Sequence, residues 1–164
     1  MTVTDELVAN AQRYAASFDK GDLPMAPAHR AAIVCCMDAR VNPYGIFGLT
    51  EGDAHVIRNA GGAVTDDTVR SLAISQRLLG TEEVLVVHHA DCGMRSFSGE
   101  DFHHQIFQDT GVRPPWAVET FSDSAEDVRQ SIARIRANPF LPRKDSVRGF
   151  VYNDHTGQLQ EVAS

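Results

Sequence analysis

Three strand-like runs constrain the fold of this chain more than any other feature. They are AAIVCCMD at 31–38, AHVIRNAGG at 54–62 and EEVLVVHHADCG at 82–93, and each closes on polar or glycine residues. The first and third contain the unbroken apolar stretches AAIVCC and VLVV, which are typical of strands that are buried on both faces, as in parallel sheets. The sequence therefore predicts a parallel sheet at the centre of the fold.

Helical segments alternate with these runs. The expected helices are 4–18, 65–80, 98–111 and 122–138, the last of them ending before Pro139. Thr65 is expected to cap the second of them, and Ser122 or Ser124 the last. The segment 146–162 indicates a strand, a turn at DHTG and a short final strand. This alternation predicts an α/β fold with a mostly parallel sheet and an antiparallel edge strand.

Length, charge and cysteine count narrow the function classes. The 164 residues show no repeat and no linker, so we expect one domain over 1–164, and the net charge of -7 does not favour nucleic acid. No apolar run approaches the roughly 20 residues that span a membrane. The first residues lack a secretion signal, so a cytoplasmic location is expected. Three cysteines, Cys35, Cys36 and Cys92, favour a metal or a reactive thiol over a disulfide framework.

The carboxyl ends of the predicted strands are where a ligand should bind in such a sheet. CCMDAR, RNAGG and HHADCG all follow strand-like runs at those ends. Side chains alternate along an extended strand, which places Cys36, Asp38 and Arg40 on one side. Cys35 then faces an apolar set, and we interpret it as a packing residue.

A metal site follows from three of these side chains. His89 and Cys92 stand three residues apart at a strand end, a spacing that lets both reach one ion. Together with Cys36 they offer two thiolates and an imidazole, which suit Zn²⁺ in tetrahedral coordination. Three protein ligands leave a fourth position open, as in catalytic zinc sites. The sequence therefore predicts one zinc ion per chain.

These motifs resemble those of β-class carbonic anhydrases, most of all the short branch known from archaea and actinobacteria. The similarity covers nearly the whole chain. Ala39 and Gly62 stand where serine and asparagine are commoner in the family, and the short branch tolerates both changes. The residues that carry the resemblance are Cys36-Met37-Asp38-Ala39-Arg40, Arg58-Asn59-Ala60-Gly61-Gly62 and His89-Ala90-Asp91-Cys92-Gly93-Met94.

The resemblance implies reversible hydration of CO2 to bicarbonate and a proton by zinc-bound hydroxide. Asp38 and Arg40 would form a dyad that orients the nucleophile, with zinc on the three ligands named above. The implied sheet order is 2-1-3-4 with a fifth strand at the edge and helices on both faces. A homodimer or homotetramer is also implied, in which residues from about 1 to 25 form an arm on the neighbouring subunit.

Several secondary roles are expectations. Asp38 could itself become a fourth zinc ligand in a closed state that low pH would favour. Asp91 is expected either to orient His89 or to cap the following segment, and His88 to be a packed histidine. The substrate pocket is expected to involve Arg58, Asn59, Ala60, Gly61, Gly62 and Gly93, with the glycines mainly shaping a turn. Apolar wall candidates are Ile46, Phe47, Val64 and Met94.

Two other functions remain open at the level of sequence. Relatives with the same zinc motif hydrolyse carbonyl sulfide or carbon disulfide, and pocket width would decide between these substrates and CO2. A non-catalytic zinc or redox-sensing protein is the other alternative, because Cys35 and Cys36 are adjacent thiols. No residue pattern identifies a proton shuttle.

Overall fold

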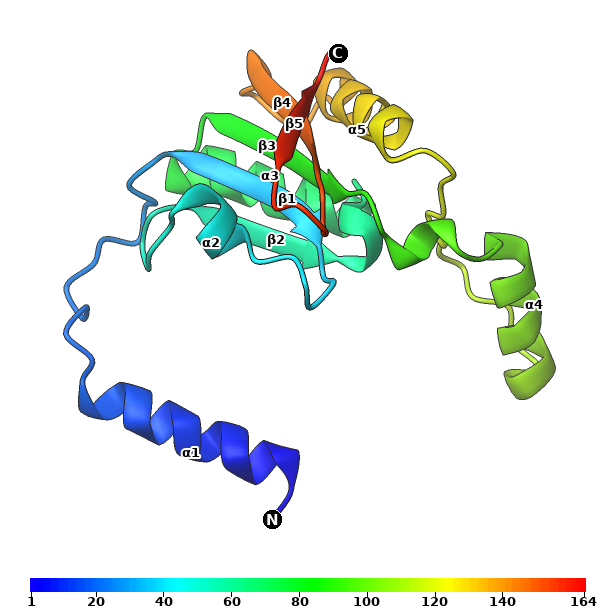
Figure 1. The fold of residues 1–164 in the computed structure, drawn as a ribbon. Helices are drawn as coiled ribbons and strands as arrows, with labels where there is room; N and C mark the ends of the chain where they lie inside the picture. Colours follow the sequence, from blue (N-terminus) through cyan, green and yellow to red (C-terminus); the bar gives the residue numbers. More distant parts are fainter.

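The computed structural model describes residues 1–164 and centres on a five-stranded sheet (Figure 1). The sheet order is β2-β1-β3-β4-β5, in which the first four strands are parallel and β5 pairs antiparallel with β4. The predicted α/β class, strand order and antiparallel edge strand are confirmed. The strands are β1 (Ala31–Cys36), β2 (His55–Asn59), β3 (Glu83–His89), β4 (Ser146–Tyr152) and β5 (Leu159–Val162).

Helices connect the strands and extend beyond them. The predicted helices overlap α1, α3, α4 and α5, and Thr65 caps α3 by accepting a hydrogen bond from the Thr68 N–H at 3.3 Å. The short α2 was not predicted, because a single turn capped by Asn42 leaves no periodic pattern. The helices are α1 (Val3–Ala16), α2 (Pro43–Phe47), η1 (Ala60–Gly62), α3 (Asp66–Leu79), η2 (Gly93–Arg95), α4 (Gly99–Thr110) and α5 (Ser124–Ala137).

The start of α5 differs from the prediction. Asp123 is the N-cap, not Ser122 or Ser124, and its carboxylate accepts a hydrogen bond from the Glu126 N–H at 2.8 Å. Asp123 has the extended backbone that a cap requires, whereas Ser124 is already helical. The Ser124 hydroxyl instead donates to the His89 carbonyl oxygen at 3.2 Å. This bond ties α5 to the end of β3.

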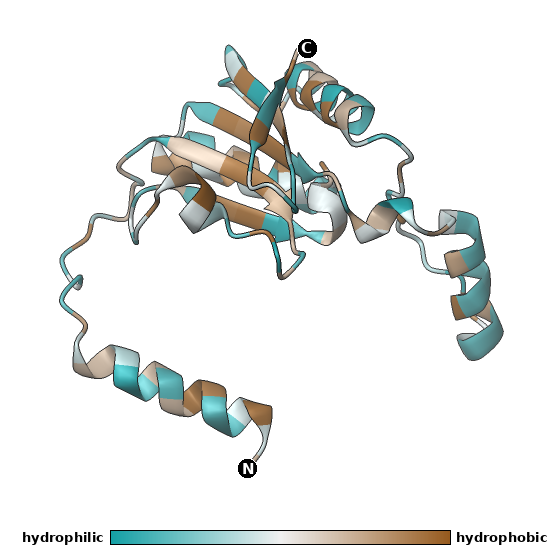
Figure 2. Ribbon diagram, in the orientation of Figure 1, coloured by the Kyte–Doolittle hydropathy of each residue, from teal (hydrophilic) through white to brown (hydrophobic).

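The two faces of the sheet are covered unequally (Figures 1 and 2). The larger core lies between the sheet and helices α3 and α5, and includes Leu72, Val86 and Ile132. The opposite face carries a smaller cluster around Cys35, against which Phe47 of α2 packs. Helices therefore lie on both faces, as predicted, although the second face has only a short one.

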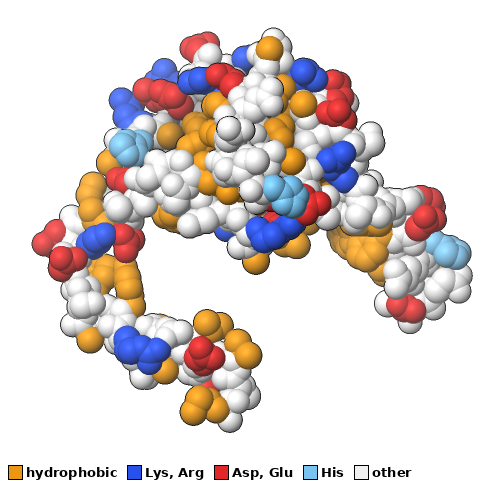
Figure 3. All heavy atoms as spheres, in the orientation of Figure 1, with side chains coloured by type: hydrophobic (Ala, Val, Ile, Leu, Met, Phe, Trp, Pro, Cys, Tyr) orange, Lys and Arg blue, Asp and Glu red, His pale blue; other side chains and the backbone are white.

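Two helices extend away from the sheet (Figure 1). Neither α1 nor α4 buries a residue, and both carry hydrophobic side chains on the molecular surface (Figure 3). Glu51 holds the end of α1 and the segment after it. Its carboxylate accepts hydrogen bonds from the hydroxyl of Tyr14, in α1, at 2.6 Å and from Lys20 Nζ at 2.5 Å. None of the helices combines the length and the apolar character needed to cross a membrane.

Candidate metal centre

The ends of β1 and β3 bring three of the predicted site residues together. Cys36 ends β1, His89 ends β3, and Cys92 follows in the loop before η2. Their ligand atoms all lie within 4.8 Å of one another, and all three residues are buried. Because β1 and β3 are parallel neighbours, their carboxyl ends meet at the same edge of the sheet.

This group of atoms fits a zinc ion. His89 Nε2 is buried without a hydrogen-bond partner, although buried ring nitrogens normally have one. The two cysteine sulfurs lie 4.0 Å apart in the same group. Two thiolates and one imidazole nitrogen are preferred zinc ligands, and an ion between them would give the unpaired nitrogen a partner.

The two adjacent cysteines differ in their surroundings. The hydrogen bond with Cys92 lowers the pKa of the Cys36 thiol well below its ordinary value, which favours the thiolate that binds metals. Burial raises the pKa of Cys35 to about 11. Cys35 packs with Val87 and Phe150 on the other face of the sheet. Its position therefore fits a packing residue and does not favour pairing with Cys36.

Asp38 and Arg40 form a two-fold hydrogen-bonded ion pair beside the candidate ligand atoms. Arg40 Nε donates to Asp38 Oδ1 at 3.0 Å, and Arg40 Nη2 donates to Asp38 Oδ2 at 2.8 Å. These bonds hold the pKa of the Asp38 carboxyl well below its ordinary value. Asp38 Oδ2 lies 3.9 Å from His89 Nε2. An ionised carboxylate is thus fixed next to the candidate metal position.

The geometry of this pair arises from a turn, not from strand alternation. β1 ends at Cys36, and the Val41 N–H donates to the Asp38 carbonyl oxygen at 3.0 Å. Arg58 of β2 fixes the turn, because its guanidinium donates to the carbonyl oxygens of Cys36, Asp38 and Val41 at 2.7 to 3.0 Å. Arg40 therefore reaches Asp38 through the turn that Arg58 holds.

The glycine turn after β2 packs against the end of β1. Gly61 and Gly62 have φ values of 82° and 65°, a region that favours glycine. A Cβ on Gly62 would lie 2.9 Å from the carbonyl carbon of Cys35, so only glycine permits this approach. The Asn59 side chain bonds both the N–H and the C=O of Ala63, at 2.7 and 2.9 Å. These features confirm the expected role of the glycines in shaping a turn.

A cavity of about 660 Å³ is lined by two of the candidate ligands, Cys36 and Cys92, and by Asp38. Several of the predicted pocket residues line it, namely Asn59, Ala60, Gly61, Gly93 and Met94. Other predicted positions are not among its lining residues, namely Arg58, Gly62, Ile46, Phe47 and Val64. Much of the apolar wall comes from segments that sequence patterns do not single out, with Phe97, Phe102, Trp116 and Val118.

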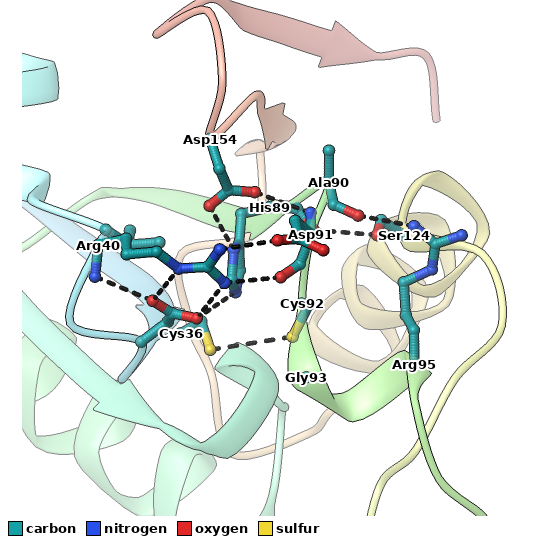
Figure 4. A network of polar contacts seen from close by, with 12 residues as sticks. Cys36, Arg40, His89, Ala90, Asp91, Cys92, Gly93, Arg95, Ser124 and Asp154 are labelled. Carbon is teal, nitrogen blue, oxygen red and sulfur yellow. Dashed lines mark hydrogen bonds and ion pairs between the residues drawn. The ribbon is translucent and has the colours of Figure 1, made fainter.

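One further carboxylate contacts the centre from the β4–β5 turn. Asp154 Oδ1 lies 2.7 Å from His89 Nδ1, and the Asp154 side chain is 2% exposed. Asp91 neither orients His89 nor caps η2; its carboxylate accepts a hydrogen bond from Arg40 Nη1 at 2.7 Å (Figure 4). The DHTG turn is visible in the sequence, but no sequence pattern places it beside a residue so distant along the chain.

Comparisons with known proteins agree with this site. Residues 31–114 match the family described as "Carbonic anhydrase". β-Carbonic anhydrase 1 of Mycobacterium tuberculosis is 56% identical over 162 residues, 99% of each chain. The carbon disulfide hydrolase of Saccharolobus solfataricus is 32% identical over 80% of this chain and 76% of its own. The crystal structure of the Streptococcus mutans carbonic anhydrase superposes with a TM-score of 0.92 at 40% identity, covering 99% of each chain. The chain therefore belongs to the β class of the carbonic anhydrase family.

Proposed function

We propose that this β-carbonic anhydrase catalyses the reversible hydration of CO2 to bicarbonate and a proton, using one zinc ion held by Cys36, His89 and Cys92. The observation that carries the proposal is the juxtaposition of these buried ligands with an arginine-bound carboxylate. The identity of 56% with a β-carbonic anhydrase over the full chain supports the same reaction. When bound, zinc makes water nucleophilic near neutral pH.

Asp38 is proposed to orient the attacking water. Its carboxylate is an acceptor fixed beside His89, so it can take a hydrogen bond from the water and direct the oxygen lone pair towards CO2. Arg40 keeps Asp38 ionised and in place, because it binds both carboxylate oxygens. These same bonds favour an open site. The closed state, with Asp38 as a fourth ligand, stays a prediction.

The apolar cavity wall suits a small neutral substrate. Phe97, Trp116 and Val118 form part of the wall near the predicted ligands. CO2 can approach along such a wall without an unpaired charge being buried, whereas the product anion gains nothing from apolar contact. The wall therefore favours entry of the gas and departure of bicarbonate.

Stopped-flow measurement of CO2 hydration tests the proposal. The protein would carry a measured amount of zinc per chain, and the assay would run from about pH 6.5 to about pH 9. We expect one zinc ion per chain and activity that rises with pH, because the attacking water must lose a proton. Full zinc occupancy without hydration at any pH would contradict the proposed function.

Carbon disulfide or carbonyl sulfide hydrolysis is the second candidate function. The 32% identity with the carbon disulfide hydrolase of Saccharolobus solfataricus favours it, since both substrates are linear triatomic molecules like CO2. The same protein should be assayed for hydrogen sulfide release from each compound. Hydrolysis faster than CO2 hydration would reverse the order of the two candidates.

Residues 1–25 are proposed to form a dimerisation arm in a homodimer or homotetramer. Leu7 and Tyr14 are exposed on one face of α1, Phe18 is exposed just after the helix, and none of the three belongs to a core cluster. An exposed apolar stripe of this kind requires a partner surface.

The three free thiols, Cys35 included, fit the reducing environment of the cytoplasm, where we propose that the enzyme works.

The variant Leu7→Glu should weaken self-association. Burial of a leucine contributes about 1.5 to 3 kcal/mol, and a symmetric dimer buries two copies of Leu7, so the dimer dissociation constant should rise roughly 100-fold or more. Sedimentation velocity over a concentration series measures this constant. The variant Gln12→Glu adds the same charge on the opposite side of α1 and should have little effect. An equal effect of both changes, or a native chain that is monomeric throughout, would contradict the arm.

A further inference from the structure

Both carboxylate oxygens of Asp154 form hydrogen bonds at the candidate metal centre. Oδ1 lies 2.7 Å from His89 Nδ1, and Oδ2 accepts a hydrogen bond from the Asp91 N–H at 2.7 Å (Figure 4). The side chain is 2% exposed although it belongs to the β4–β5 turn. A buried carboxylate with two short bonds in different directions is held in a single position.

The bond to His89 selects one form of the imidazole ring. The Asp154 carboxylate accepts a hydrogen bond from Nδ1–H, so the ring proton stays on Nδ1, and Nε2 keeps its lone pair and faces Cys36 and Cys92. Nε2 is one of two buried ring nitrogens without a hydrogen-bond partner, and the other, His88 Nδ1, lies outside the candidate ligand group. A carboxylate acceptor on the far nitrogen makes a histidine a stronger metal ligand and fixes its orientation.

The bond to Asp91 connects the same carboxylate to the dyad. The Asp91 carbonyl oxygen accepts a hydrogen bond from Arg40 Nη2 at 2.8 Å, and its carboxylate accepts one from Arg40 Nη1 at 2.7 Å. Arg40 in turn holds Asp38. One continuous set of hydrogen bonds therefore runs from Asp154 through the Asp91 main chain to the Asp38 carboxylate.

We propose that Asp154 is a positioning residue for both halves of the centre, the metal ligand His89 directly and the Asp38–Arg40 pair through Asp91. The inference rests on the proposed function and assigns the C-terminal hairpin to the reaction centre. The hairpin turn, 65 residues from His89 along the chain, then controls metal affinity as well as turnover.

The variants Asp154→Ala and Asp154→Asn test this role. Zinc affinity would be measured by competition with a chromogenic chelator. We expect the zinc dissociation constant to rise about 10- to 100-fold for D154A. The rise should be smaller for D154N, because one amide oxygen can still accept from His89 or from Asp91 but not from both. kcat for CO2 hydration should fall in both variants, while KM changes little.

A second His–Asp pair provides the matched control. His88 precedes His89 on β3, and its Nε2 lies 2.6 Å from Asp127 Oδ2, but the ring stacks near Phe121 and lies outside the metal-ligating group. Asp127→Asn should therefore leave the zinc affinity within roughly twofold. Unchanged affinity in D154A, or equal losses in D154A and D127N, would overturn the proposal.

A measurement on the metal-free protein separates this inference from the proposed function. Ring ¹⁵N chemical shifts of His89 report which nitrogen carries the proton. We expect the proton on Nδ1 in the native chain and a mixture of both forms in D154A. The same mixture in the native chain would overturn the positioning role. These shifts and the zinc affinities do not depend on CO2 hydration, whose absence would count against the proposed function alone.

Discussion

Replacing Cys36 with alanine is expected to abolish zinc binding and to lower CO2 hydration by about a thousandfold or more. The change removes one of the two thiolates from a group whose ligand atoms lie within 4.8 Å of one another. His89 and Cys92 alone leave too few ligands for a stable tetrahedral site. Zinc per chain by elemental analysis and CO2 hydration by stopped flow measure the two effects.

The neighbouring Cys35→Ala variant is the control for this experiment. It also removes one thiol group, but this thiol belongs to the apolar cluster on the other face of β1. We expect zinc content and activity close to native, with a loss of stability of about 1 kcal/mol from the small cavity. Zinc retained in C36A, or lost in C35A, would show that the ligand assignment is wrong.

Replacing Asp38 with asparagine is expected to lower kcat/KM for CO2 roughly a hundredfold while zinc stays bound. The amide keeps the size of the side chain but removes the charge, and only one of its two terminal atoms can accept from Arg40. The attacking water then lacks the fixed carboxylate that accepts its hydrogen bond in the native protein. Arg40→Lys should have a smaller effect of the same kind, because a lysine keeps the charge but cannot bind both carboxylate oxygens in parallel.

An acid on the wall of the same cavity provides the comparison for Asp38. Asp67 lines the cavity and pairs with Arg70 at 2.7 Å, but this pair is exposed and lies outside the metal-ligating group. Asp67→Asn should leave kcat/KM within roughly twofold of native. Equal losses in D67N and D38N would attribute the effect to cavity charge instead of to orientation of the water. Loss of zinc in D38N would contradict the proposed role.

The alternation of strands and helices could be predicted because its causes are local. The runs 31–38 and 82–93 must be apolar on both faces of a covered parallel sheet, and this requirement is visible in the letters themselves. Thr65 could be assigned as a cap for the same reason. The Asp123 cap and the end of β1 were missed, since bonds from other elements fix them: Ser124 turns towards β3, and Arg58 bonds the carbonyl groups after Cys36.

In the candidate site, too, some residues could be predicted from the sequence and others could not. Cys36, His89 and Cys92 could be named in advance because they follow directly on strands whose carboxyl ends must share one edge. Asp154 could not, since its turn reaches His89 only after β4 has paired beside β3. The wall residues Phe97 and Trp116 lie in segments without a periodic pattern, and they meet over the centre only in three dimensions.

The sequence by itself predicted the fold class, the candidate ligand set and the acid–base pair beside it, because each depends on residue type and short spacing. The tertiary structure alone decided which groups support them. Arg58 holds the turn that joins Asp38 to Arg40, and Asp154 bonds both His89 and the Asp91 main chain. The physical reason is that a buried polar group must find a hydrogen-bond partner wherever the packed chain offers one, and that partner can lie far away in the sequence.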